Sequence, residues 1–282
     1  MSISEDSTAV TLTHQCGDTL KVLLYGATII SWVSGRERLF LSSKAALDGS
    51  KAVRGGIPLV FPVFGKSNAG PTKELPQHGF ARTSTWRLLS HKADSESTQV
   101  KLELSNDLIS QDAHKLWPYA FNLIDLKANS FVTSMEVQNK DKEPFDFNFL
   151  FHTYFAVNNI STVSVRGLNG AQYVDKKRDA ANFEETEKDV KISNETDRVY
   201  KSPSGPTQIV DEDCTVDVQR DNLNDVVVWN PWENAAKNMG DFGPEDGWKK
   251  MLCIEAGSVS NWQNLGPGES WKGVQTVIRS ML

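Results

Sequence analysis

The segment from residue 145 to residue 157, FDFNFLFHTYFAV, limits the possible folds of this chain more than any other stretch. Phenylalanine occupies every second position from Phe145 to Phe151, and a period of two is typical of a β-strand. One face of the predicted strand therefore carries four aromatic rings that require a hydrophobic core. We expect a sheet that contains this strand.

His152 falls on the other, more polar face of the same predicted strand. A rigid strand holds an imidazole in a fixed direction beside buried surface, which suits proton transfer near neutral pH. A half-buried histidine that is bonded to a neighbouring strand fits the same pattern. The strand alone leaves both interpretations open.

Short runs of alternating hydrophobic residues recur along the chain and are separated by turn residues. Only residues 106–116 and 235–239 favour a helical turn. Such a sequence predicts an all-β fold, a large antiparallel β-sandwich or barrel with a few short helices. No linker or internal repeat interrupts it, so we expect one domain over residues 1–282. The other expected strands are residues 8–14, 20–25, 28–33, 38–42, 86–91, 98–105, 121–129, 131–139, 207–220, 225–230, 249–257 and 269–279.

Two stretches depart from this strand pattern. Residues 42–81 hold too many glycines and prolines for regular structure, together with the apolar run IPLVFPVF, which must be buried. We therefore expect a fixed loop that wraps one end of the sheet, and a loop of this length is usually functional. Residues 175–196 are rich in lysine, aspartate and glutamate and are expected to form a solvated excursion.

The composition argues against several classes of function. Thirty lysines and arginines against 36 aspartates and glutamates give a net charge of −6, which disfavours nucleic-acid and anionic-membrane surfaces. One small phosphorylated ligand is still compatible, because two arginines suffice to clamp a phosphate. The acidic start MSISEDSTAVTLT has no signal segment, and the apolar runs are too short for a membrane span.

The cysteines and histidines indicate a reduced compartment and chemistry without a metal. Three cysteines in no CxxC pair favour the cytoplasm. The five histidines show no metal-ligand spacing. Glycine-rich phosphate loops and the GxSxG nucleophile motif are also absent from the sequence, so no cofactor is expected. Proton transfer by histidine, glutamate and arginine is the chemistry that fits.

Polar side chains beside apolar or tightly turning segments are the candidate functional groups. Glu255 is expected at the end of the apolar strand MLCIEAG, where a carboxylate needs an ionic partner or acts as a base. Arg54 precedes two glycines that permit close approach of a ligand. For both residues a structural ion pair fits the sequence as well.

Other candidates are less specific. The segment QHGFAR places Gln77 and Arg82 in one turn and strand, where loop packing is the alternative. Asp197 follows the charged excursion and by itself suits a turn. Three further side chains, whose contact with a ligand the sequence does not decide, are His78, Trp229 and Trp232.

Six motifs occur in the order and approximate spacing of the aldose 1-epimerase, or galactose mutarotase-like, superfamily. They are RGGIPLVFPVFG, QHGFAR, FLFHTYFAV, TDRVY, VVWNPW and CIEAG. From about Val10 to Arg279 the chain more narrowly resembles the hexose-6-phosphate mutarotase (glucose-6-phosphate 1-epimerase) branch. Each motif alone is weak, and the six in order are specific. The resemblance implies a β-supersandwich of one domain, cytoplasmic and active without metal or cofactor, and we expect a monomer.

The resemblance also implies the roles of six residues. By position, His152 falls on the general acid of the family and Glu255 on its general base. Positions that contact substrate fall on Arg54, Gln77, Arg82 and Asp197. The implied reaction interconverts the α and β anomers of a hexose 6-phosphate, above all glucose 6-phosphate, by ring opening and closure at C1. Two arginines suit the phosphate dianion.

Two other functions are compatible with the sequence. A non-catalytic carbohydrate-binding or sugar-sensing module would keep the tryptophans and arginines but would need neither His152 nor Glu255. An aldose 1-epimerase for unphosphorylated sugar would differ only in the loop that recognises phosphate. An assay of anomer interconversion tests the first alternative, and a comparison of glucose with glucose 6-phosphate tests the second.

Overall fold

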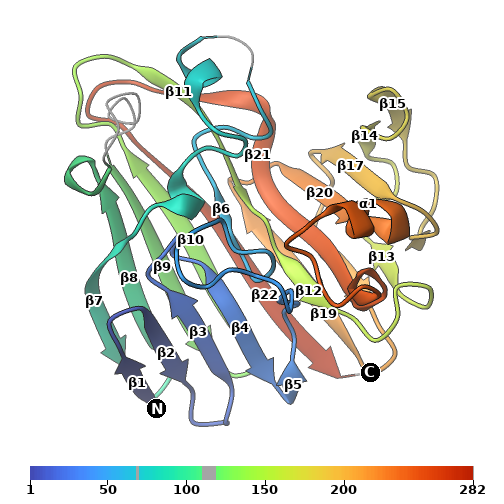
Figure 1. Ribbon diagram of the computed structural model, residues 1–282, viewed down its shortest axis with the longest axis horizontal. Helices are drawn as coiled ribbons and strands as arrows, with labels where there is room; N and C mark the ends of the chain where they lie inside the picture. The colour runs from blue at the N-terminus through green and yellow to red at the C-terminus, as the bar shows by residue number, and fades with distance from the viewer. Residues whose placement is uncertain (68–69, 110–118, 282) are drawn as a thin grey trace.

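The computed structural model describes residues 1–67, 70–109 and 119–281, and its regular structure is mainly antiparallel β-sheet. The described strands form three sheets of five, nine and eight strands (Figure 1). The predicted all-β antiparallel sandwich is confirmed. Among the described helices, none has the length and apolar character that crossing a membrane requires.

Two of the sheets contain the N-terminal and C-terminal strands. The first sheet has the spatial order β1-β2-β3-β4-β5 and consists of β1 (Ser2–Glu5), β2 (Ala9–Thr13), β3 (Thr19–Leu23), β4 (Ile29–Ser34) and β5 (Arg36–Glu37). The second sheet has the order β16-β13-β18-β19-β22-β10-β9-β8-β7. Its strands are β16 (Val190–Lys191), β13 (Ser164–Arg166), β18 (Thr207–Val210), β19 (Cys214–Asp221), β22 (Ser270–Met281), β10 (Ser130–Gln138), β9 (Tyr119–Lys127), β8 (Thr98–Ser105) and β7 (Arg87–Ala93).

The third sheet has the order β15-β14-β17-β20-β21-β11-β6, and β12 pairs with β21 beside this path. Its strands are β15 (Ala181–Glu184), β14 (Gln172–Asp175), β17 (Thr196–Lys201), β20 (Asp225–Asn230), β21 (Met251–Leu265), β11 (Phe145–Phe151), β6 (Leu59–Val60) and β12 (Tyr154–Ala156). The helices within the described residues are α1 (Trp232–Asn238), η1 (Pro71–Glu74), η2 (Ala81–Thr83), η3 (Asn106–Leu108) and η5 (Gly247–Lys250). The helical turn predicted at residues 235–239 is therefore confirmed. Of the helix predicted at residues 106–116, only η3 and Ile109 lie within the described residues.

The second sheet forms one layer, and the other two sheets pack against it. Trp32 of β4 meets Phe131 of β10 edge-on, with 5.0 Å between ring centroids. Phe147 and Phe149 of β11 meet Trp271 of β22 at 5.3 and 5.7 Å. These contacts join the three sheets in one hydrophobic cluster.

The predicted phenylalanine ladder is buried, but its strand is shorter than expected. All four phenylalanines of β11 are at most 9% exposed. The strand ends at Phe151 and resumes at Tyr154 as β12, instead of continuing to residue 157. His152 lies between the two strands, and its amide donates to the Pro58 carbonyl at 3.0 Å, next to the pairing of β11 with β6. The candidate imidazole is therefore held by a backbone hydrogen bond to the loop at residues 42–81.

The loop at residues 42–81 is fixed by close backbone contacts, as predicted. It contains the two-residue strand β6, which pairs with β11. Gly56 and Gly79 have positive φ angles of 65° and 70°. A Cβ at Gly56 would lie 2.1 Å from the Ile29 carbonyl oxygen, and one at Gly79 would lie 2.1 Å from that of Phe61. Only glycine fits these two positions without a shift of the backbone.

Three expectations about the strands are wrong. The charged stretch at residues 175–196 is not simply a solvated excursion, because β15 and β16 within it pair with β14 and β13. Glu255 does not end its strand, since β21 continues to Leu265 between β20 and β11. The strand expected at residues 38–42 is replaced by isolated bridges at Leu39 and Leu41.

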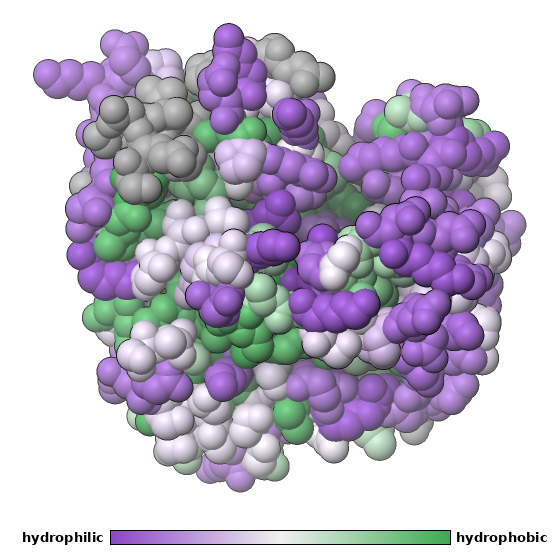
Figure 2. Space-filling model, viewed as in Figure 1, coloured by the Kyte–Doolittle hydropathy of each residue, from purple (hydrophilic) through white to green (hydrophobic). Residues whose placement is uncertain are grey.

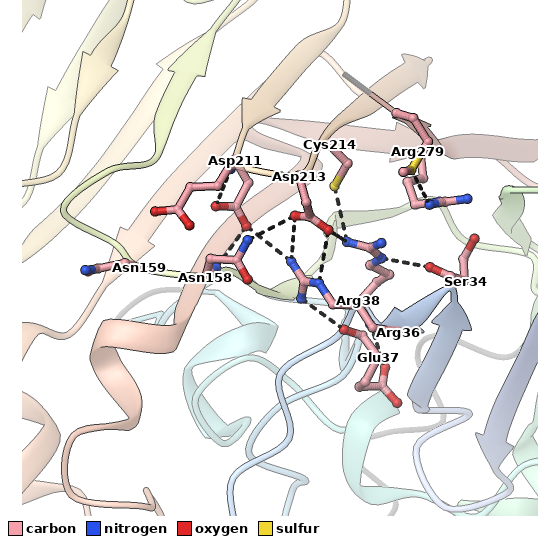
Figure 3. Close-up of polar contacts among 12 residues, drawn as sticks. Ser34, Arg36, Glu37, Arg38, Asn158, Asn159, Asp211, Asp213, Cys214 and Arg279 are labelled. Carbon is pink, nitrogen blue, oxygen red and sulfur yellow. Dashed lines mark hydrogen bonds and ion pairs between the residues drawn. The ribbon is translucent and has the colours of Figure 1, made fainter.

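An ionic cluster joins the first sheet to the turn between β18 and β19 (Figure 3). Arg38, which is 4% exposed, donates to the carboxylate of Asp213 at 3.0 Å. It also donates to the Ser34 carbonyl at 2.9 Å and to Cys214 Sγ at 3.2 Å. Hydrogen bonds from Arg36 and then Arg38 hold the pKa of the Asp213 carboxyl well below its usual range. The cluster therefore stabilises the packing of two sheets.

Replacing Arg38 by methionine is expected to lower the free energy of unfolding by about 1–3 kcal/mol, because buried hydrogen bonds to a charged group are lost. The matched control is Arg166→Met, which breaks an exposed ion pair to Asp189 and is expected to cost less than about 1 kcal/mol. Urea unfolding of both variants measures the difference. Equal losses would contradict the structural role of the cluster.

Candidate active site

A pocket of about 310 Å³ lies against the third sheet and is bounded by the loop at residues 42–81. In Figure 2 the surface is hollowed beside the lobe at the upper right, which carries β14, β15 and β17 in Figure 1, and hydrophilic side chains flank the hollow. Five of the six predicted site residues line the pocket, namely Arg54, Gln77, His152, Asp197 and Glu255. A volume near 300 Å³ is within the range of small-molecule sites.

His152 and Glu255 meet in this pocket although they are far apart in the sequence. Glu255 is the fifth residue of β21, and Val227 of β20 is its partner in the ladder. His152 follows β11, which pairs with β21 on the other side. His152 Nδ1 lies 3.4 Å from Glu255 Oε1. The pairing of β21 with both neighbours therefore sets the separation of imidazole and carboxyl.

Tyr154 holds the imidazole from one face. The rings of His152 and Tyr154 stack with 4.7 Å between centroids and only 10° between planes. The amide of Tyr154 donates to the Gly56 carbonyl at 2.9 Å, so the loop also fixes the start of β12. Trp229 meets the His152 ring edge-on at 5.9 Å. Packing thus leaves the imidazole little freedom to rotate.

Burial moves the pKa values of the two groups apart. Glu255 is 2% exposed, and burial, followed by the negative charge of Asp197, raises its pKa well above the ordinary value of 4.5. Burial, followed by the charges of His78, Arg82 and others, lowers the pKa of His152 well below 6.5. Between the lowered pKa of His152 and the raised pKa of Glu255, the pair holds one proton in total. Within the described residues, His152 Nδ1 and Glu255 Oε2 have no hydrogen-bond partner.

The two arginines of the sequence prediction have different positions. Arg54 lines the pocket, and its guanidinium donates to Asp241 and to the Tyr154 hydroxyl, each at 3.2 Å. Arg82 is not among the residues of the pocket wall. Its guanidinium donates to the Gln77 carbonyl at 2.7 Å, and its buried Nε has no partner in the described part of the chain.

Asp197 reaches the pocket from β17, and burial raises its pKa above the ordinary value. Its carboxylate lies 3.4 Å from Nζ of Lys176, a pocket residue that sequence reasoning missed. Lys176 follows β14 inside the charged stretch that was expected to be solvated. No spacing or motif distinguishes this lysine from its charged neighbours. Only the pairing of β14 with β17 brings it to the site.

The structure separates the side chains that the sequence left undecided. His78 and Trp229 line the pocket. Trp232 instead packs on Trp248, with 4.6 Å between centroids. His78 accepts a hydrogen bond at Nδ1 from the Gly65 amide at 3.2 Å, and burial lowers its pKa to about 3. It is therefore a neutral imidazole of the pocket wall.

Three possible donor atoms meet beside the pocket, and two of them belong to residues of its wall. Single ligand atoms of His152, Cys253 and Glu255 lie within 4.8 Å of one another. Cysteine binds metals as the thiolate, and burial raises the pKa of the Cys253 thiol well above 9.0, so this set disfavours a metal ion. The convergence arises from strand pairing and has no signature in the sequence spacing. Two of the three groups are the same ones that proton transfer would use.

Comparison with known proteins identifies the family. The aldose 1-epimerase family matches residues 8–277. A Cenchrus ciliaris protein provisionally named glucose-6-phosphate 1-epimerase is 36% identical over 266 residues, which cover 90% of this chain and 79% of its own. An Escherichia coli K12 protein with the same provisional name is 34% identical over 247 residues, or 86% and 80% of the two chains.

A solved structure agrees with these relatives. The crystal structure of a Salmonella typhimurium protein, provisionally described as a mutarotase, matches with a TM-score of 0.87 and 27% identity. The match covers 100% of this chain and 94% of the other. The resemblance seen in the sequence motifs is thereby confirmed. The chain belongs to the aldose 1-epimerase family and is an epimerase.

Proposed function

We propose that this epimerase interconverts the α and β anomers of a hexose 6-phosphate, with glucose 6-phosphate as the first substrate to test. The observation that carries the proposal is the contact of His152 and Glu255, 3.4 Å apart in a pocket of sugar size. The provisional names of the relatives support the choice of glucose 6-phosphate.

In the proposed mechanism, Glu255 removes the proton of the O1 hydroxyl. The electrons of that O–H bond form the carbonyl at C1, the C1–O5 bond breaks, and His152 gives a proton to O5. Rotation about C1–C2 presents the other face of the aldehyde. On closure O5 attacks C1, His152 takes the O5 proton back and Glu255 returns the proton to O1. Each positioned group is typically worth on the order of 10²–10⁴ in rate.

Both half-reactions need a pair that holds one proton in total. Ring opening moves this proton from the imidazole to O5 while Glu255 gains one from O1, and closure reverses both transfers. The pKa of Glu255 is raised and that of His152 is lowered, so the one-proton state spans neutral pH. Burial favours the form of this state that carries the proton on Glu255, which is the form that ring closure uses. Ring opening starts from the other form, in which the proton has crossed the 3.4 Å contact to His152.

The phosphate of the substrate is proposed to lie between Arg54 and Arg82. Arg82 carries a buried Nε without a partner in the described part of the chain, and Arg54 presents its guanidinium at the pocket wall. Gln77 and Asp197 line the pocket and suit the sugar hydroxyls. An epimerase for unphosphorylated aldoses is the alternative within the family, and it would not need both arginines.

A non-catalytic sugar-binding module is the alternative from another class. Such a module gains nothing from a buried carboxyl and an imidazole with unpartnered atoms, because both are costly to bury.

We also propose that the chain is one domain and acts as a cytoplasmic monomer. A single species near 31.4 kDa in sedimentation velocity is the expected result, and a larger one would contradict it.

Glu255→Gln and His152→Asn are each expected to lower kcat for glucose 6-phosphate by about 10²–10⁴, because each removes one proton-transfer group. Anomer exchange followed by NMR, with the spontaneous rate subtracted, measures the loss. Thermal unfolding is the control. Glu255→Gln is expected to be at least as stable as wild type at alkaline pH, since glutamine removes a carboxyl that is costly to ionise. A near-normal kcat in either variant would refute the assignment.

Arg82→Met is expected to lower kcat/KM for glucose 6-phosphate by about 10–100-fold, the value of a charge-assisted hydrogen bond. For glucose the expected change is small, because glucose has no phosphate. The matched control is Arg87→Met, which removes an exposed guanidinium paired with Glu103. It should leave kcat/KM for both substrates unchanged. Equal losses on both sugars would exclude Arg82 from phosphate recognition.

The pH dependence of kcat is expected to be a broad bell. Below the lowered pKa of His152 both groups are protonated, and above the raised pKa of Glu255 both have lost their proton. Activity should therefore persist below pH 6.5, the ordinary histidine value, and fall on the alkaline side as Glu255 deprotonates. A profile that rises through pH 6.5 to an alkaline plateau would disagree with a one-proton pair.

A further inference from the structure

Lys176 bridges two elements that bound the active-site pocket. Its ammonium group lies 3.4 Å from the Asp197 carboxylate on β17 and 4.2 Å from the ring centroid of Phe64 in the loop at residues 42–81. Its side chain is 37% exposed, so the group is held at the wall and still reaches solvent. The mechanism described above assigns it no role.

Asp197 places a second carboxylate in the pocket that holds Glu255. β17 is two strands from β21 in the third sheet, which corresponds to about 10 Å between strands. Two negative charges in a desolvated pocket repel, and each favours the protonated form of the other. The charge of Asp197 accordingly raises the pKa of Glu255, and Lys176 opposes this shift.

The two arginines of the site have contacts other than Asp197 and are the groups proposed above to bind the phosphate. Arg54 donates to Asp241, and Arg82 donates to the Gln77 carbonyl. The titratable and charged groups around Glu255 are His152 after β11, Tyr154 on β12, Cys253 on β21, Asp197 on β17, Lys176 after β14, and His78, Arg54 and Arg82 from the loop and η2. Among the described residues, Lys176 is the cation within ion-pair distance of Asp197.

We propose that Lys176 is a positioning residue of the epimerase reaction, which neutralises Asp197 so that the proton-transfer pair His152–Glu255 does not face a second uncompensated carboxylate. The inference rests on the proposed function and deepens it, because it identifies what sets the working pH range of the same site. Lys176 acts through charge, and the transferred proton never resides on it.

Removal of the Lys176 side chain should shift the kcat–pH profile in a definite direction. Without the ammonium group, the pocket gains one net negative charge. A negative charge stabilises the protonated forms of both His152 and Glu255, so each proton leaves at higher pH. Both limbs of the kcat–pH profile should therefore move to higher pH. Loss of a purely structural contact would lower kcat by the same factor at every pH and would leave the limbs in place.

The experiment measures kcat for glucose 6-phosphate against pH by NMR anomer exchange in wild type, Lys176→Met and Lys176→Arg. Lys176→Met should displace both limbs to higher pH, and Lys176→Arg should restore the wild-type limbs because it keeps the charge. Lys176→Gln is a second neutral variant, to be used if the methionine protein unfolds. Limbs of the neutral variants that coincide with wild type would overturn the proposal.

Asp197 supplies a charge-balanced test. Asp197→Asn alone should move the limbs to lower pH, because it removes the negative charge and keeps Lys176. The double variant Lys176→Met with Asp197→Asn restores the net charge, so its limbs should return close to wild type even if kcat is lower. A double variant whose limbs coincide with those of Lys176→Met would also overturn the proposal.

The adjacent lysine is the matched control. Lys177 pairs with Glu195 at 2.7 Å and is not part of the pocket wall. Lys177 acts on Asp197 only at longer range, so Lys177→Met should move the limbs by less than Lys176→Met does. A shift as large as that of Lys176→Met would refute a local effect. The proposed function fails if wild type does not accelerate anomer exchange. If wild type does so and the limbs do not move in Lys176→Met, only the role of Lys176 fails.

Discussion

Burial of a carboxyl group beside an imidazole is the constraint on which the rest of the site depends. Glu255 is 2% exposed, and neither it nor His152 meets a full set of hydrogen-bond partners within the described chain. Two opposite charges in such a place would be costly, whereas the neutral pair with the proton on Glu255 is not. The pocket therefore stores a proton donor and a proton acceptor in one contact. Acid/base-catalysed opening and closing of a hemiacetal requires one group of each kind.

The scaffold keeps this pair in place from three sides. β21 is paired along both edges near Glu255, so the carboxyl cannot move without breaking a ladder. Backbone bonds from the loop to His152 and Tyr154 hold the imidazole in a break of the strand. The ionic residues act at longer range. Arg54 and Lys176 bring positive charge to the walls, and each is itself fixed by an aspartate.

The sequence was sufficient for the fold class and for five of the residues that line the pocket. Alternation reveals β11, and six ordered motifs identify the family. It was not sufficient for details that depend on pairing between distant strands. Lys176 looks like any exposed lysine until β14 pairs with β17. The length of β21 beyond Glu255 is likewise set by its two partner strands.

The most direct test follows the proton and the reaction in one sample. The side-chain carboxyl of Glu255 is observed by ¹³C NMR over a pH range, with Glu255→Gln to assign its signal, while magnetisation exchange between the two anomeric C1 signals of glucose 6-phosphate reports turnover. The account predicts that the Glu255 carboxyl titrates well above the exposed glutamates, and that exchange on the alkaline side falls with the same midpoint. The account would be contradicted by a Glu255 carboxyl that titrates together with the exposed glutamates, or by an exchange rate that stays constant while this carboxyl titrates.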